Sequence, residues 1–223
     1  MFLNVPTDVE IVLQLIFALT VIVGSGIIYV RTREIYALTE SQSLKLFRNS
    51  FLLFALAYTI KLPTNYFILS YVNVTSSIPF FILSVAFIYF SSLAIFYLLL
   101  STSYTYWKEK KLPDPIASIH FTAFFVVLLT LFDSLALVFL VEFILFLIVT
   151  FVCLKSLKKN KGKLLFRAAS NMYLVFFMLY LLSILLTRVT QSELVRNIVL
   201  LASTLLFMEI VRRVLKALKG PRK

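Results

Sequence analysis

Lys61 and Glu142 are the residues best placed to do chemistry, because each carries an ionisable group inside a long apolar run. In a helix that begins at Leu46, Lys61 lies about 22 Å along the axis, within the outer third of a bilayer. Glu142 lies about 12 Å below a turn that we predict at Asp133. Charged groups at such depths are costly and commonly bind an ion, a proton or a polar ligand. Both residues are therefore candidates for ligand or ion binding.

A second interpretation is open for each of these residues. Lys61 can extend to the outer headgroups from a helix that Pro63 bends or ends, and we favour this interpretation. Glu142 can pair with Lys61, bind a cation or proton, or stay protonated and hydrogen-bonded. Asn65 and Tyr89 complete the set of ligand-binding candidates, although packing of the ring is the competing role for Tyr89.

Other polar residues favour structural roles. We place His120 near the cytoplasmic interface, early in its apolar run, and expect its ring to be packed or hydrogen-bonded. Glu209 stands four residues before Arg213, a spacing typical of an ion pair within one helix. The spacing of Thr20 and Gly24 predicts that the first helix closely approaches another backbone.

The residue inventory argues against an enzyme and against a bound cofactor or metal. The chain has one cysteine, Cys153, and one histidine, His120, whereas metal sites built on these residues need several. It contains neither a G-x-S-x-G motif nor an H-E-x-x-H motif. The only aspartates lie outside the centres of the apolar runs, so an intramembrane aspartyl protease is also excluded. These are Asp8, Asp114 and Asp133.

The composition indicates an integral membrane protein. Of the 223 residues, 61% are hydrophobic and 14% are charged, and the mean hydropathy is +0.98. Soluble domains have about 25% charged residues, so a soluble chain of this composition could not cover its surface. The sequence therefore predicts a single all-α membrane domain over residues 1–223.

Seven apolar runs predict a bundle of seven transmembrane helices. Of the 22 lysines and arginines, 19 fall in four clusters between or after these runs. Because short cytoplasmic loops collect basic residues, the chain must cross the membrane an even number of times between clusters. Seven crossings then place the N-terminus outside and the C-terminus in the cytoplasm. The runs are 11–30, 46–70, 78–104, 116–132, 135–154, 164–187 and 194–211.

Two features refine this plan. The apolar stretch 116–154 is about twice the length that one crossing needs, so we predict a hairpin at Asp133 and Ser134. Seven helices also suit a parallel repeat of three, one and three helices. A Leu-Phe-Arg triplet that ends at Arg48 recurs at Arg167, and both triplets fall at the predicted cytoplasmic start of a helix.

These observations favour a receptor-like, sensor-like or partner-binding subunit of the cell membrane. The alternative is a transporter of small solutes, coupled to ions through Glu142 and Lys61. The net charge of +12 is explained by topology, so no nucleic-acid partner is expected. Anionic lipids at the cytoplasmic face, a protein partner and a homo-oligomer are the expected associations. The candidates for binding lipid headgroups are Arg48, Arg167, Arg212 and Arg213.

Overall fold

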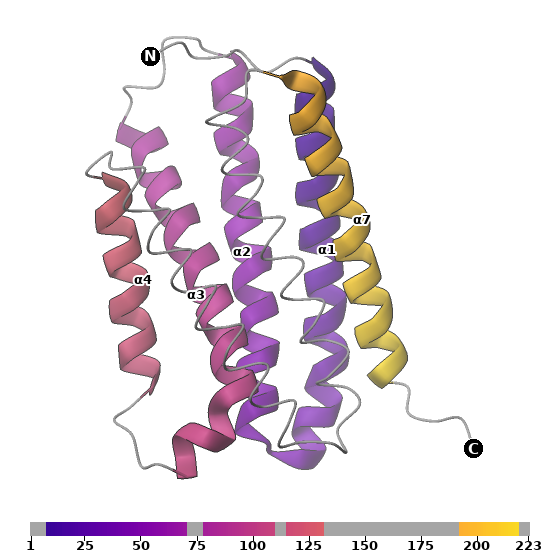
Figure 1. The fold of residues 1–223 in the computed structure, drawn as a ribbon, viewed down its shortest axis with the longest axis vertical. Coiled ribbons are helices and arrows are strands. Elements are labelled where there is room, and N and C mark those ends of the chain that lie inside the picture. The colour runs from indigo at the N-terminus through magenta and orange to yellow at the C-terminus, as the bar shows by residue number, and fades with distance from the viewer. Residues whose placement is uncertain (1–7, 71–77, 110–114, 132–191, 219–223) are drawn as a thin grey trace.

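The computed structural model describes residues 8–70, 78–109, 115–131 and 192–218. This part of the chain is all-helical (Figure 1). Its five helices are α1 (Asp8–Thr39), α2 (Gln42–Ser70), α3 (Ile78–Glu109), α4 (Pro115–Leu131) and α7 (Glu193–Leu218).

The helices pack side by side in the order α4, α3, α2, α1, α7, as Figure 1 shows. Neighbours along the chain are antiparallel; for example, the Ser43 hydroxyl at the start of α2 donates to the Ser101 carbonyl oxygen late in α3, at 2.5 Å. Helices α1 and α7 run in the same direction. Glu10 meets Arg196 near the start of both helices, and Gly24 meets Phe207 further along both.

Four of the five described helices, all except α4, are longer than the apolar runs. The first run ends at Val30, but α1 continues to Thr39 and so carries Arg31 and Arg33 on its last turns. An apolar run marks the length in contact with hydrocarbon, whereas hydrogen bonding within the helix continues into the headgroups and water. Glu40 then adopts a left-handed φ of 47°, and its N–H donates to the Tyr36 carbonyl, which ends α1 in a tight turn.

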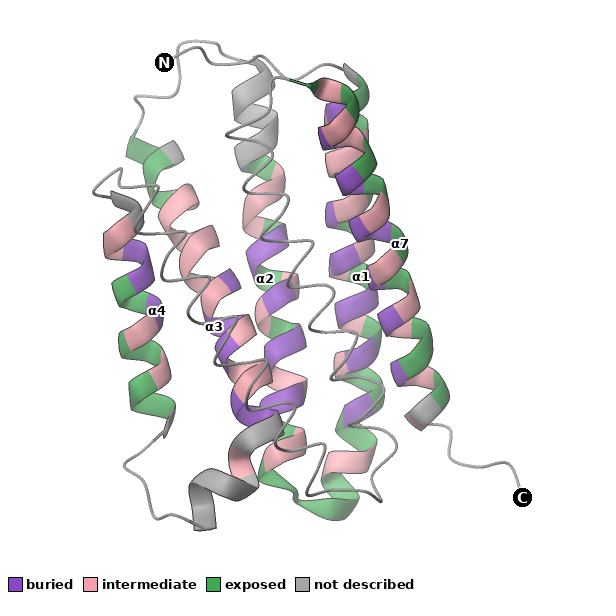
Figure 2. Ribbon diagram, in the orientation of Figure 1, coloured by how far each residue is buried: buried purple, intermediate pink, exposed green. Residues whose placement is uncertain are grey.

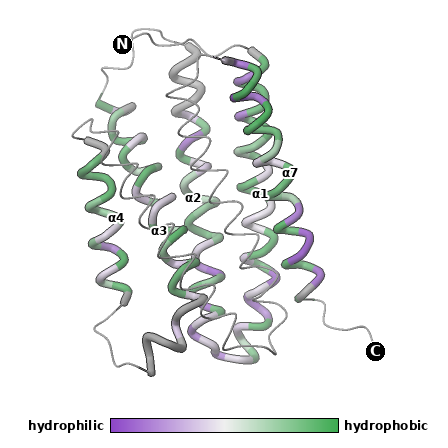
Figure 3. Tube along the Cα trace, in the orientation of Figure 1, coloured by the Kyte–Doolittle hydropathy of each residue, from purple (hydrophilic) through white to green (hydrophobic). Residues whose placement is uncertain are grey.

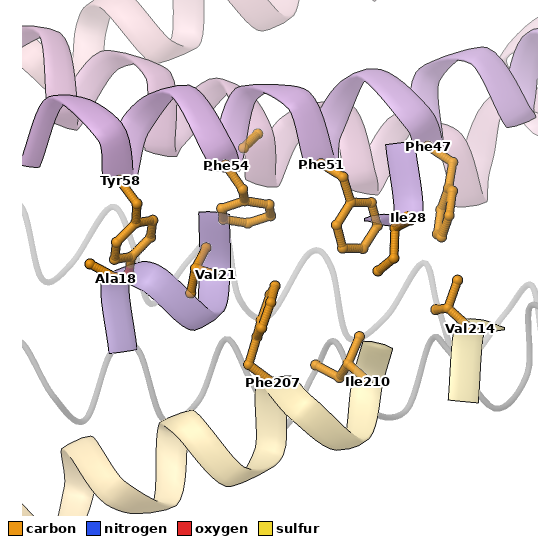
Figure 4. Packing of buried hydrophobic residues seen from close by; sticks show 11 residues of the cluster. Ala18, Val21, Ile28, Phe47, Phe51, Phe54, Tyr58, Phe207, Ile210 and Val214 are labelled. Carbon is orange, nitrogen blue, oxygen red and sulfur yellow. The ribbon is translucent and has the colours of Figure 1, made fainter. Parts of the chain in front are cut away.

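Aromatic and aliphatic side chains from α1, α2 and α7 form the main core (Figure 4). Phe51 of α2 and Phe207 of α7 are each only 1% exposed. Val21 and Ile28 of α1 lie between these two helices and are fully enclosed. This core fixes the relative positions of α1, α2 and α7.

The outer surface of this part of the molecule is also apolar. Large hydrophobic residues are exposed on α1, α4 and α7, for example Val23, Phe121 and Leu205. Figure 2 shows exposed positions along the ribbons of these three helices. In water, continuous surfaces of this kind would promote aggregation. Helices α1, α3 and α7 are each long and apolar enough to cross a membrane. Figure 3 shows hydrophilic colour at the lower end of α7, where Arg212 and Arg213 lie.

The other two described helices match a membrane span less well. Helix α2 contains Lys45, Arg48 and Lys61, which lower its hydropathy. Pro63 lies inside α2, which continues to Ser70, so the proline does not end the helix. Helix α4 has 17 described residues, at the lower limit for a crossing.

Several predictions fall outside the described residues. These are the hairpin at Asp133 and Ser134, the helices 135–154 and 164–187, and the second Leu-Phe-Arg triplet, which ends at Arg167. The seven-helix count and the internal repeat therefore stay predictions.

Candidate functional site

His120 lies between two tyrosines at the contact between α3 and α4. Its Nδ1 is 2.9 Å from the Tyr89 hydroxyl, and its Nε2 is 3.4 Å from the Tyr97 hydroxyl. The tyrosines are eight residues apart and so lie on one face of α3. A neutral imidazole donates from one nitrogen and accepts at the other, and each hydroxyl can do either. The expectation that His120 is hydrogen-bonded is thus confirmed.

This Tyr89–His120–Tyr97 cluster lies deep in the apolar part of the bundle. Tyr89 is close to the middle of the stretch Phe81–Ser101, which is long and apolar enough to span a membrane. His120 therefore lies further from the end of the bundle where α3 connects to α4 than its position near the start of α4 indicates. The reason is that α3 continues beyond Ser101 to Glu109, so the connection between the two helices lies beyond this apolar stretch.

Apolar side chains hold the cluster in place. Leu93 and Phe96 of α3 pack with Ala123 and Val126 of α4 in a second core. Ala123 is completely buried, and its small side chain permits close contact between the helices. Within the described part, His120 remains exposed and the two tyrosines are half-buried, so the polar atoms are accessible from outside the α3–α4 pair.

Lys61 lies on α2, where this helix packs against the side of α3 that faces away from α4. Its ammonium nitrogen is 5.5 Å from the centre of the Tyr58 ring and 5.0 Å from the centre of the Phe87 ring. Such distances suit cation–π attraction. None of the ion pairs among described residues involves Lys61. The structure thus brings Lys61 to aromatic faces and separates it from the His120 cluster.

Arg48 is held between two rings near the start of α2. The carbon at the centre of its guanidinium lies 5.2 Å from the Tyr29 ring centre and 4.8 Å from that of Tyr36, both on α1. Arg212 and Arg213 instead both bind Glu209, at 2.5 Å and 2.8 Å. The predicted pairing of Glu209 with Arg213 is confirmed, and binding of lipid by these arginines stays a prediction.

Sequence reasoning missed an ion pair between the first and last described helices. The Arg196 Nη2 and Nε atoms lie 3.0 Å and 3.3 Å from Glu10 Oε2, and both side chains are almost fully buried. Gln14 also donates to Glu10, at 3.3 Å. One signal was present: Arg196 is a basic residue outside the four clusters, and Glu10 is an acid at the same predicted end of the bundle.

The remaining candidates lie outside the described part. Glu142 and Arg167 fall within residues 132–191, and the side chain of Asn65 on α2 is also not described. Among the described residues, no group of three or more His, Cys, Asp or Glu side chains could hold a metal ion.

Comparison with known proteins finds no match for this chain. No protein-family model, curated protein or solved structure matches it. Its function must therefore be argued from its own residues.

Proposed function

We propose that the chain is a seven-helix, multi-pass protein of the cell membrane, without enzymatic activity, that acts as a receptor-like or partner-binding subunit. The shared direction of α1 and α7 supports this topology. Between the end of α1 and the start of α7 the chain must cross an odd number of times. Helices α2, α3 and α4 account for three crossings, so residues 132–191 supply an even number. Two apolar runs in that segment make the total seven.

The Tyr89–His120–Tyr97 cluster is the observation that carries the receptor-like role. Hydroxyl and imidazole groups at the depth of the hydrocarbon are costly unless they find polar partners. The Tyr89 hydroxyl can both donate and accept, so its contact with His120 leaves capacity for a further hydrogen bond. A small lipophilic molecule with one polar group matches this arrangement, because its apolar body can stay in the hydrocarbon while its polar group binds the cluster.

Native mass spectrometry can test this role with whatever ligand the host membrane supplies. The protein would be purified from that membrane in mild detergent, and bound small molecules would be released and identified. We expect a molecule that is retained by the wild type and lost in His120→Phe. Thr122→Val is the matched control, because the Thr122 hydroxyl donates to the Ser118 carbonyl within α4 and, among the described residues, has no hydrogen bond with the cluster. Equal retention by all three proteins would remove the cluster as the ligand site.

The direction of the helices in the membrane can be tested by cysteine labelling. Cys153→Ser removes the only native thiol. In that background, Ser192→Cys marks the start of α7 and Ser41→Cys marks the turn after α1; both positions are exposed. An impermeant maleimide should label Ser192→Cys on intact cells, and Ser41→Cys only after the cells are opened. The reverse pattern would contradict an external N-terminus.

Transport is the second candidate, and Lys61 is the observation that favours it. A cation held against Tyr58 and Phe87, rather than against a described carboxylate, is available to an anionic group. A flux assay in liposomes, with Glu142→Gln and Lys61→Met, separates the two functions. Flux that is lost in both variants would support transport, and no flux with any solute tested would favour the receptor-like role.

A further inference from the structure

Arg48 combines a fixed side chain with unused hydrogen-bonding capacity. Its Nε is enclosed and has no hydrogen-bond partner in the described part of the chain. Its side chain is half-buried, and it contacts the faces of Tyr29 and Tyr36. Two ring faces hold the guanidinium by cation–π attraction but do not satisfy its N–H donors.

The charge around Arg48 favours an anion. Arg33 and Lys45 lie at the same end of α1 and α2, and both are exposed. Glu34 and Glu40 are the nearest acids along the chain, but neither forms an ion pair with Arg48. A planar guanidinium matches the oxygens of a phosphate group, which the N–H donors of its two terminal nitrogens can bind through two parallel hydrogen bonds.

An apolar stripe extends from Arg48 along α2. Leu52 and Leu56 follow Arg48 at intervals of four residues, so all three lie on one face of the helix. The leucines are 37% and 42% exposed. A guanidinium at the end of such a stripe suits a molecule with a charged head and a long apolar tail. Arg48 lies about 9 Å from the start of α2, which suits the headgroup level of a bilayer.

From this arrangement we propose that Arg48, held between Tyr29 and Tyr36, binds the phosphate of an anionic glycerophospholipid whose acyl chain lies along Leu52 and Leu56. The placement of this site in the inner leaflet rests on the topology proposed above. The binding chemistry does not rest on that topology, because it depends only on the local contacts of α1 and α2.

Lipid retention in nanodiscs provides the test. The protein would be placed in phosphatidylcholine nanodiscs with added phosphatidylglycerol, transferred to detergent, and the co-purified phosphatidylglycerol measured by native mass spectrometry. Arg48→Lys keeps the positive charge but loses the planar guanidinium and its parallel N–H donors. We expect about tenfold less bound phosphatidylglycerol. Arg33→Lys is the matched control at an exposed arginine, and we expect a change within about twofold. Equal retention in both variants would overturn the proposal.

A second pair of variants tests the rings without altering charge. The double variant Tyr29→Phe/Tyr36→Phe keeps both ring faces and should retain the lipid. Tyr29→Leu/Tyr36→Leu removes them and should lose it, even where its circular dichroism matches that of the wild type. Retention by the leucine variant would contradict a role for the rings.

The source of the phosphate is tested by competition. Excess inorganic phosphate should leave phosphatidylglycerol bound, because it lacks the acyl chain that Leu52 and Leu56 contact. Displacement by inorganic phosphate would overturn the lipid assignment in favour of a site for free phosphate. Cysteine labelling that inverted the topology would move the site to the outer leaflet without changing any of these binding results, so the two proposals fail separately.

Discussion

Glu10 and Arg196 form a buried ion pair between α1 and α7, with 3.0 Å between Glu10 Oε2 and Arg196 Nη2. The pair joins residues 186 positions apart in the chain. Because burial removes the water that would otherwise solvate both charges, each charge is stabilised by the other. This pair therefore fixes how the start of α7 docks on α1.

Removing one partner should cost far more than removing both. Arg196→Ala leaves the buried Glu10 carboxylate without its Arg196 counter-charge, and we expect a loss of about 3–5 kcal/mol in the free energy of unfolding. The double variant Glu10→Leu/Arg196→Met should recover most of this loss, because no unpaired charge remains. Chemical denaturation in detergent micelles would measure both values.

The exposed pair on α7 provides the control. Glu209 binds Arg212, whose side chain is 67% exposed, so water screens this pair and Glu209→Gln should lower the free energy of unfolding far less than Arg196→Ala does. If Arg196→Ala cost no more than Glu209→Gln, the buried pair would not stabilise the contact between α1 and α7.

The Gly24 contact predicts a second effect on the same pair of helices. A Cβ atom at Gly24 would lie 2.8 Å from Val211 Cγ2 and 2.9 Å from Phe207 Cε1. Since Phe207 is buried in the core, Gly24→Ala should force the helices apart and cost about 1–3 kcal/mol. Thermal unfolding in detergent would report the change.

Gly26 is the matched control on the same helix. A Cβ atom there would meet nothing within 4 Å. Gly26→Ala should therefore be neutral or stabilise α1 by about 0.5–1 kcal/mol, because alanine favours the helix. Equal losses from both substitutions would indicate a property of the glycines themselves rather than of the α1–α7 contact.

Local features of the sequence predicted local features of the fold. The Thr20–Gly24 spacing indicated a close helix approach, and Gly24 does lie against Phe207. The four-residue spacing of Glu209 and Arg213 indicated their ion pair. Both predictions depend on the period of a single helix, which the sequence carries directly.

Contacts between helices were not predictable in the same way. The partners of Arg48, His120 and Arg196 all lie on other helices, and they depend on how each helix is rotated and how deeply it lies. A largely apolar sequence says little about rotation, because almost every face can contact either lipid or protein. Most helices were also predicted to be too short. Hydropathy marks the part of a helix that lies in hydrocarbon, whereas backbone hydrogen bonds continue beyond it.

The hydrogen bond between Tyr89 and His120 predicts a measurable coupling between α3 and α4. In a double-mutant cycle with Tyr89→Phe and His120→Phe, we expect a coupling energy of about 0.6 kcal/mol, typical of hydrogen bonds between membrane helices. The cycle with Tyr97→Phe should give a smaller value, because that hydroxyl lies 3.4 Å from the ring nitrogen, against 2.9 Å for Tyr89. The opposite order would contradict the geometry of the cluster.

Lys61 and Phe87 provide the corresponding test at the contact between α2 and α3. The Lys61 ammonium lies 5.0 Å from the Phe87 ring centre, so the cycle of Lys61→Met with Phe87→Leu should yield a coupling of about 0.5–2 kcal/mol. Phe90 is the control, because its ring contacts Tyr89, and Phe90→Leu should not couple to Lys61→Met. Equal coupling to both phenylalanines would mean that Lys61 responds to helix packing in general. Coupling to Phe87 alone would show that the lysine is held by an aromatic face, which stabilises its charge in the apolar bundle.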